Sequence, residues 1–338
     1  MEAETVTLAR FCTALFACAV LTMGTVAADA PQKIRLTVAT YEVAQGPYLV
    51  AVAKGYFAAE GLDVDLIFSG GGTATPALIS GSVDGSASSA SALSAILRGA
   101  ALRIVLVFAD TPIYNIWGQP SIHSLADFKG KAIGVATRGD TFEVASRLAL
   151  QKAGIPADAV GFTPIGSGDA GSAAFESGAL AGVVLSTSQS AQLIDKGQLK
   201  NAHVVYRLKG NIHMPFDGFV VQQKLLTDNP VLARKIVRAI VKGSRYIHAF
   251  KTQTEAILNK YDPSETTRAM NDDYEEFLNA ASADLTVSTA DAQTDLDVRA
   301  ALLGIPKDQV PPLDHVYDFS LVRSVNAELN ASRWKPTP

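Results

Sequence analysis

The sequence predicts an α/β protein with two doubly wound lobes, joined by two crossover segments and separated by a cleft. Three observations support this. Short β-rich runs alternate with helical runs along most of the chain. The 338 residues exceed what one hydrophobic core usually supports, so about two domains are expected. Two irregular stretches, 110–120 and 210–218, interrupt the alternation and are the expected hinge crossovers.

The first 28 residues are predicted to be a signal peptide that precedes this fold. Phe11 to Ala28 carry no charge and are apolar or small. Val26-Ala27-Ala28 places small residues where signal peptidase reads, so we expect cleavage after Ala28. An uncleaved membrane anchor is the alternative. The apolar run before Cys18 is short for a lipoprotein signal, so lipid anchoring at Cys18 is not expected.

Composition limits the classes of function. Both cysteines, Cys12 and Cys18, lie in the leader, so the mature chain is expected to have no disulfide, thiolate metal site or cysteine nucleophile. An exported chain without cysteine fits the periplasm of a double-membrane bacterium. The formal net charge of −4 argues against nucleic acid as a partner, because gripping phosphates needs clustered Lys and Arg.

Residues 33–112 and 219–338 are expected to form the first lobe. Ile34–Ala39 alternates apolar and polar residues as a strand does. Pro47 opens the next helix, since proline is tolerated in a first helical turn. The pattern continues with strands 63–68, 85–88, 103–108 and 219–222, with helices 48–54, 73–81 and 91–98, and with a helical tail that begins at Asn229-Pro230 and continues at 254–260, 265–281, 289–303 and 319–329.

Residues 119–212 are expected to form the second lobe. Its best-marked helix is 140–153, where Asp140 can cap the first turn, Glu143 stands three residues later as in a capping box, and Gly154 ends the helix. The remaining predicted elements are strands 132–135, 160–165, 181–185 and 202–206 and short helices 170–176 and 188–196.

Catalytic and metal-binding signatures are absent from the sequence. There is no H-E-x-x-H, G-x-S-x-G or Walker A motif, and the five histidines have no metal-ligand spacing. Gly166-Ser167-Gly168-Asp169-Ala170-Gly171 matches G-x-G-x-x-G, but the helix it opens is only about two turns long, too short for a dinucleotide crossover. We therefore expect no catalytic residue, no metal and no cofactor.

Small or polar turns follow several strands and open the next helix. In open α/β sheets, ligands bind outside the carboxyl ends of the strands, where helix N-termini attract anions. The alternative for any one turn is ordinary helix capping. The residues expected to contact a ligand are Tyr41, Gln45, Gly46, Gly71, Gly72, Thr73, Ser89, Ser91, Tyr114, Arg138, Gly139, Asp140, Thr141, Ser167, Ser186 and Asp217.

Three kinds of side chain in this set suggest specific roles. Arg138 is the one cation in the turns and its planar fork suits a carboxylate or sulfonate; pairing with Asp140 or Glu143 is the alternative. Asp217, at the second crossover, could hold a ligand amine or fix the hinge. Aromatic residues such as Tyr114 could wall a pocket or stack on a ring, whereas core packing is expected for Trp117 and Phe142.

Two strings together carry a resemblance to a known family. Pro47 to Val64 contains Lys54-Gly55-Tyr56-Phe57 and Glu60-Gly61-Leu62-Asp63-Val64, and the second lobe contains Ser124-Leu125-Ala126-Asp127-Phe128-Lys129-Gly130-Lys131. The chain resembles the sulfonate-, nitrate- and thiamine-pyrimidine-binding proteins of ABC importers over about Ile34 to Gly218. The helical tail matches only in general pattern.

The resemblance implies a type II periplasmic binding fold, a monomer, and delivery of a small-molecule solute to an ABC permease with its ATPase. We expect a binding protein for a small organic anion, a sulfonate or carboxylate that could carry an aromatic ring, and not an enzyme. The alternatives are a neutral pyrimidine-type solute, an enzyme on the same fold, and an exported sensor that docks to a receptor kinase. A cysteine-rich motif serves the eukaryotic pyrimidine-synthase branch, and the mature chain lacks it.

Overall fold

The computed structural model describes residues 30–166 and 169–338. The predicted signal peptide, with its two cysteines and its cleavage site after Ala28, lies outside the described residues, as does Ser167. Residues 31–338 form one compact unit, and within it the strands divide into two five-stranded sheets. We call each sheet with its covering helices a lobe. The two sheets and their helices confirm the predicted α/β architecture.

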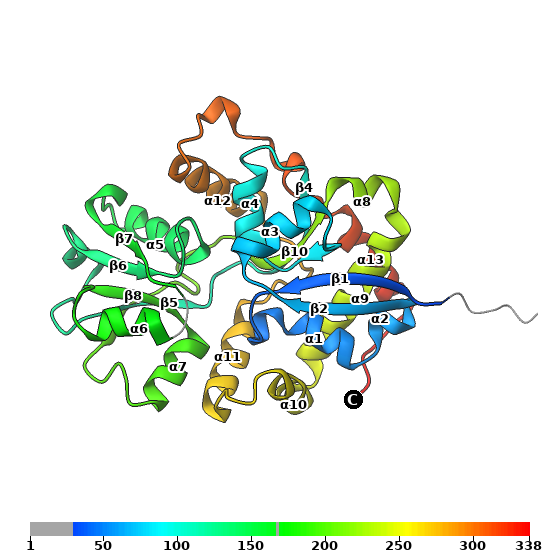
Figure 1. Ribbon diagram of the computed structural model, residues 1–338, viewed down its shortest axis with the longest axis horizontal. Helices are drawn as coiled ribbons and strands as arrows, with labels where there is room; N and C mark the ends of the chain where they lie inside the picture. The colour runs from blue at the N-terminus through cyan, green and yellow to red at the C-terminus, as the bar shows by residue number, and fades with distance from the viewer. Residues whose placement is uncertain (1–29, 167–168) are drawn as a thin grey trace, which may run out of the picture. The chain divides into compact units, whose positions relative to one another are not determined.

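The sheet of lobe 1 is mixed. Its strands lie in the order β2-β1-β3-β10-β4 (Figure 1). β1 pairs in parallel with β2 and β3, while β10 runs antiparallel to β3 and β4 and so closes the sheet with chain that returns from lobe 2. The strands are β1 (Gln32–Val38), β2 (Leu62–Phe68), β3 (Gly85–Ser86), β4 (Leu102–Ala109) and β10 (Phe216–Gln222).

The sheet of lobe 2 has the equivalent order β7-β6-β8-β5-β9 (Figure 1). β6 is parallel to β7 and β8, and β5 runs antiparallel to both β8 and β9. The elements of this lobe are β5 (Tyr114–Gly118), β6 (Ala132–Val135), α5 (Thr141–Lys152), β7 (Gly161–Pro164), α6 (Asp169–Glu176), β8 (Gly182–Ser186), α7 (Thr187–Asp195) and β9 (His203–Arg207).

Most helices belong to lobe 1 or to the tail that follows it. α1 packs against α9 so closely that a Cβ on Gly243 would lie 2.1 Å from the carbonyl oxygen of Pro47, which explains the glycine there. The helices are α1 (Gly46–Ala53), α2 (Tyr56–Ala59), α3 (Gly71–Ser80), α4 (Ser89–Ile96), α8 (Gln223–Asp228), α9 (Pro230–Ala249), α10 (Lys251–Tyr261), α11 (Thr267–Ala280), α12 (Thr289–Leu302) and α13 (Ser320–Ala331).

The prediction of an irregular segment over 110–120 is wrong for its central residues. Tyr114 to Gly118 form β5, which lies between β8 and β9. Pro112 and Pro120, which indicated irregular structure, stand on either side of this strand. The second predicted crossover, 210–218, likewise ends early because β10 begins at Phe216. The chain therefore passes between the two sheets at 110–113 and at 208–215.

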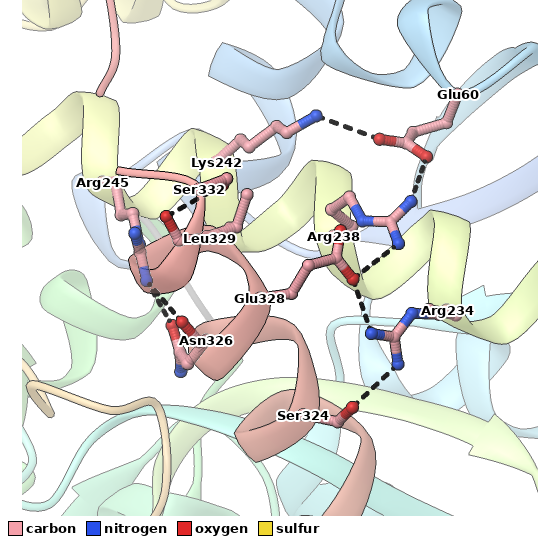
Figure 2. A network of polar contacts seen from close by, with 10 residues as sticks. All are labelled: Glu60, Arg234, Arg238, Lys242, Arg245, Ser324, Asn326, Glu328, Leu329 and Ser332. Carbon is pink, nitrogen blue, oxygen red and sulfur yellow. Dashed lines mark hydrogen bonds and ion pairs between the residues drawn. The ribbon is translucent and has the colours of Figure 1, made fainter. Parts of the chain in front are cut away.

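An ionic network, which we call the α9 network, attaches the final helix to lobe 1. The Glu60 carboxylate accepts hydrogen bonds from Arg238 at 2.8 Å and Lys242 at 3.0 Å (Figure 2). The Glu328 carboxylate on α13 accepts from Arg234 at 2.5 Å and Arg238 at 2.9 Å. Arg238 thus bridges both acids, and the network joins the end of α2, the middle of α9 and α13.

Candidate functional site

The two lobes meet where the N-terminal turn of α7 approaches lobe 1. Ser186 donates a hydrogen bond through Oγ to Oε1 of Glu42 at 2.8 Å, and Ser188 donates to Oε1 of Glu265 at 2.5 Å. Ser186 ends β8 and Ser188 lies in α7, both in lobe 2. Glu42 follows β1 of lobe 1, and Glu265 precedes α11 in the helical tail. The residues of this interlobe seam are Glu42, Gln45, Tyr114, Ser186, Ser188, Asp217, Glu265 and Asp273.

Two predicted ligand residues, Gln45 and Asp217, contact each other at the seam. Gln45 donates through Nε2 to Oδ1 of Asp217 at 3.3 Å, while its Oε1 accepts from the backbone N–H of Ala39 at 2.7 Å. Gln45 is buried and so ties the carboxyl end of β1 to the start of β10. Asp217 has a φ of +46°, a left-handed conformation that is uncommon for a residue other than glycine. The local structure therefore holds the Asp217 carboxylate at a fixed position.

Tyr114, a third predicted residue, lies among the acids of the seam. Its ring packs edge-on against Phe142, with centroids 4.2 Å apart, and against Phe216 at 5.1 Å. Burial raises the pKa of its hydroxyl well above the ordinary value, and the negative charges of Asp217 and Glu42 add to that shift. Tyr114 is thus an aromatic wall beside carboxylates.

The carboxylates of the seam resist ionisation. Burial raises the pKa of Glu42 to about 7, against the hydrogen bond from Ser186, and burial also raises the pKa of Asp217 to about 7. Burial and the neighbouring Glu42 charge raise the pKa of Asp273 well above its usual range. The charged side chains that act on Glu42 and Asp273 are themselves acidic. The seam is therefore a site of unneutralised acidic groups.

The N-terminus of α5 is capped by the chain's own acids. Asp140 accepts from the backbone N–H of Glu143 at 2.9 Å and from that of Thr137 at 2.6 Å. Glu143 accepts from the backbone N–H of Gly139 at 2.8 Å. At Gly139, Asp140 and Thr141 the alternative of ordinary helix capping is therefore the one that the structure supports, with N–H groups of this turn already bonded.

Arg138 is exposed and pairs with neither of its expected internal partners. Glu143 forms its ion pair with Arg147 at 2.7 Å, and Asp140 is occupied by the helix cap. Among the contacts of the described residues, none engages the Arg138 guanidinium. The cation remains accessible at the carboxyl end of β6.

The remaining predicted residues are spread over other turns of lobe 1. Thr73 bonds within its own turn to Ser69, oxygen to oxygen 2.6 Å, beside Gly71 and Gly72. Ser91 bonds to Thr75 at 2.6 Å. Ser89 and Gly46 are buried at the starts of α4 and α1. The contacts of Thr73 and Ser91 lie within lobe 1, and the ligand role of all these residues stays a prediction.

Tyr41 belongs to an aromatic cluster next to the seam. Its ring lies 4.9 Å from that of Phe68 at the end of β2 and 5.9 Å from that of Tyr261 at the end of α10. Phe68 is 58% exposed, which is unusual for so large an apolar side chain. We call these three residues the aromatic shelf. Tyr41 directly precedes Glu42 in the sequence, and Phe68 presents ring surface to solvent.

The sequence reading missed three acids and an ion pair that shape this region. Glu42 adjoins the predicted Tyr41, but Glu265 and Asp273 come from the helical tail, which gave no local signal. Arg299 on α12 is 2% exposed; its Nε donates to both oxygens of Asp295, at 2.9 and 3.1 Å, and its Nη1 donates to the carbonyl oxygen of Gly139 at 2.8 Å. α12 is thereby fixed to the turn before α5.

Three hollows in the described part of the molecule lie away from the seam. One of about 250 Å³ is lined by Ile79, Leu102 and Lys224 of lobe 1, and one of about 470 Å³ by residues of lobe 2 that include His123 and Tyr206. A void of about 10 Å³ beside Arg299 and Tyr317 has room for about one water. The described residues contain no group of three or more His, Cys, Asp or Glu placed to hold a metal ion.

Comparisons with known proteins place the chain in a family. Residues 43–254 match the family described as NMT1/THI5 like, which is more than half of the chain, so the protein belongs to that family. The riboflavin-binding protein RibY of Chloroflexus aurantiacus is 29% identical over 211 residues, covering 58% of this chain and 57% of RibY. The match thus spans a little over half the length of that curated relative.

Solved structures share the fold over most of the chain. The alkanesulfonate-binding protein SsuA from Xanthomonas axonopodis pv. citri, bound to MOPS, matches with a TM-score of 0.69 and 16% identity, covering 85% of this chain and 99% of SsuA. The nitrate-binding protein NrtA from Synechocystis PCC 6803 matches with a TM-score of 0.65 and 15% identity, covering 90% and 91%. The type II periplasmic binding fold that the sequence implied is therefore confirmed.

No helix within residues 30–166 and 169–338 combines the length and the apolar character needed to span a membrane.

Proposed function

We propose that this protein captures a small aromatic solute between its two lobes and delivers it to an ABC permease with its ATPase, without catalysing a reaction. The observation that carries the proposal is the interlobe seam, where polar side chains from the strand ends of both lobes meet in a chain of the NMT1/THI5-like family. We propose export to the periplasm by the N-terminal leader and action as a monomer.

The proposed mechanism is closure over the solute. Within the described residues, the segments 110–113 and 208–215 are the ones that connect the sheets, so they are the proposed hinges. Hydrogen bonds from Ser186 to Glu42 and from Ser188 to Glu265 hold the lobes together at one edge. A solute that enters the seam would replace some of these bonds, and the permease would recognise the closed form.

Two observations favour an aromatic solute. The shelf of Tyr41, Phe68 and Tyr261 presents ring surface beside the seam, and a planar ligand could stack there. The relative RibY carries the name of a riboflavin-binding protein. A neutral pyrimidine-type or flavin-like ring would fit such a shelf equally well in chemical terms.

A small organic anion is the second candidate solute. Arg138 is exposed and could form a two-pronged pair with a sulfonate or carboxylate, and SsuA, with the same fold, was solved with MOPS. The acids of the seam oppose an anion, because Glu42 and Asp217, with pKa values raised to about 7, are negatively charged for part of the time near neutral pH and would repel it. An anion would have to bind on the Arg138 side, away from these carboxylates.

The test is a thermal-shift and calorimetry screen of the chain that begins after Ala28. The panel contains riboflavin, a 4-aminopyrimidine, an alkanesulfonate and nitrate, and a solute that binds the folded state raises Tm by mass action. Arg138→Gln should weaken an anion by about 1.5–3 kcal/mol and leave a neutral ring unaffected. The proposal fails if no panel member raises Tm and mass spectrometry finds no co-purified solute, or if a bound solute is converted to product.

A further inference from the structure

We infer that Glu42 and Asp217 select solutes that carry a cationic nitrogen group, such as an amine or amidine on the aromatic ring, and that they exclude anions. The inference rests on the proposed function, because it assumes that the solute enters the interlobe seam. The charge of the solute is decided neither by the aromatic shelf nor by the fold.

The carboxylates of Glu42 and Asp217 have unused hydrogen-bonding capacity. Glu42 accepts a hydrogen bond from Ser186 at 2.8 Å and Asp217 accepts one from Gln45 at 3.3 Å. Both donors are neutral, whereas a carboxylate can accept about four hydrogen bonds and is best satisfied by a cation. An ammonium or amidinium placed between the two carboxylates would supply the missing donors together with the opposite charge.

One buried carboxyl oxygen of Asp273, a neighbour of Glu42 in the seam, has no hydrogen-bond partner among the described residues. Asp273 is 0% exposed, and its Oδ2 accepts from the backbone N–H of Val43 at 2.8 Å. The oxygen that lacks a partner among the described residues is Oδ1. Because Val43 follows Glu42 directly and the two carboxyl groups act on each other, this oxygen belongs to the same polar cluster. A buried polar oxygen without a partner leaves the cluster able to bond a polar group from outside the chain; this oxygen accepts an N–H when Asp273 is ionised and can donate when its raised pKa keeps it protonated.

Three cationic side chains of the second crossover and the helical tail pair with acids outside the seam. Arg299 pairs with Asp295 at 2.9 Å, Arg268 with Asp195 at 3.0 Å, and Lys209 with Glu276 at 2.6 Å. The groups facing Glu42 from other elements are Asp217, Asp262 and Glu265, and Asp140 and Asp273 also act on the neighbouring Tyr114. Within the described residues no ion pair neutralises Glu42, Asp217 or Asp273.

Proton exchange follows from this arrangement. Since burial raises the pKa of both Glu42 and Asp217 to about 7, each carries its proton for part of the time near neutral pH. A cation binds the ionised form, so its binding should release protons and should strengthen as pH rises through 7. A neutral ring should show neither effect, and an anion should bind more weakly as pH rises.

The experiment compares three probes that share one ring: benzamidine, benzamide and benzenesulfonate. Calorimetry on the chain that begins after Ala28, at about pH 6 and about pH 8, should show benzamidine binding more tightly at the higher pH, with proton release detected from the dependence on buffer ionisation. Glu42→Gln and Asp217→Asn should each weaken benzamidine by about tenfold or more, the range expected for a charged hydrogen bond.

The controls separate this inference from the proposed function. Asp65→Asn removes an exposed acid on β2 and should leave benzamidine binding unchanged, and unfolding curves confirm that each variant is folded. Benzenesulfonate binding more tightly than benzamidine, or benzamidine binding that ignores Glu42→Gln and Asp217→Asn, overturns the inference but leaves solute binding intact. Failure of benzamidine to bind at about millimolar concentration also overturns it, since that is the weakest useful affinity.

Discussion

Two groups of acidic side chains in this protein are treated in opposite ways. In the α9 network, Glu60 and Glu328 each accept hydrogen bonds from two cationic side chains, and Arg238 is shared by both (Figure 2). At the interlobe seam, Glu42 and Asp217 receive only neutral donors. The pairs from Arg234 and Arg238 lower the pKa of Glu328, whereas burial raises the pKa of Glu42 to about 7.

The difference separates acids that hold the fold from acids that are left for another purpose. A half-buried carboxylate with two cations gains both charge pairing and hydrogen bonds. Ionisation of a buried carboxylate that has no cationic partner lowers the free energy of unfolding. Sites that bind ligands often keep such unfavourable groups, because function requires them. The acids of the seam, which lack cationic partners, support the proposed binding role, whereas the charge pairs of the α9 network join α9 to Glu60 and α13.

The largest effect is expected at the α9 network. Glu60→Ala removes a carboxylate that is only 9% exposed. The partly buried Arg238 keeps its pair with Glu328, whereas Lys242 loses its pair with Glu60. Removing one partner of a buried ion pair costs about 3–5 kcal/mol, and partial exposure of the cations reduces this to about 2–3 kcal/mol. Urea unfolding measures the loss. Asp65→Ala, an exposed acid close in sequence, is the control, and an equal loss in both variants would contradict the structural role of Glu60.

The next effect has the opposite sign and lies at the seam. The pKa of Glu42 rises from 4.5 in the unfolded chain to about 7 in the folded protein, so the native state holds the proton more tightly and stability falls as pH rises from 4.5 through 7. Glu42→Gln cannot ionise, and its amide oxygen can still accept from Ser186. We expect it to stabilise the solute-free protein by about 1–2 kcal/mol at about pH 8.

Thermal unfolding across the pH range checks this prediction. The gain from Glu42→Gln should shrink as pH falls and approach zero below pH 4.5, where the wild-type carboxyl becomes protonated in both states. Asp217→Asn should behave alike, because the pKa of Asp217 rises from 3.8 to about 7. A Glu42→Gln protein that is less stable than the wild type at about pH 8 would show that Glu42 is a structural acid like Glu60.

The fold was largely predictable because periodicity is a local signal. The strands that follow apolar alternation and the helix capped by Asp140 lie within a few residues of their predicted bounds. β5 was missed because Pro112 and Pro120 flank it, and its place between β8 and β9 depends on pairing with strands far along the chain. The short helices α2 and α8 were missed because four and six residues show too little period.

The site was predictable only where a strand-end turn carries it. That rule led to Gln45 and Asp217, which contact each other, and to Ser186, which bonds to Glu42 of lobe 1. It could not lead to Asp273, which reaches the backbone of Val43 across 230 residues of sequence. At Asp140 the sequence allowed both a ligand contact and a helix cap with Glu143 as in a capping box, and the structure shows the cap. A tertiary contact such as that of Asp273 leaves no trace in a local pattern.

The smallest effect is expected at an exposed ion pair that also crosses the lobes. Arg268 lies at the start of α11, is 51% exposed, and pairs with Asp195 at the end of α7 at 3.0 Å. Arg268→Ser should cost no more than about 0.5 kcal/mol, because water screens such pairs and ordering two long side chains opposes them. High salt should abolish even this difference, whereas the response of the partly buried Ser186–Glu42 bond to Glu42→Gln should persist. Urea unfolding at low and high salt measures both. A loss above about 1 kcal/mol from Arg268→Ser would mean that exposed pairing, and not the buried seam, governs how firmly the lobes hold together.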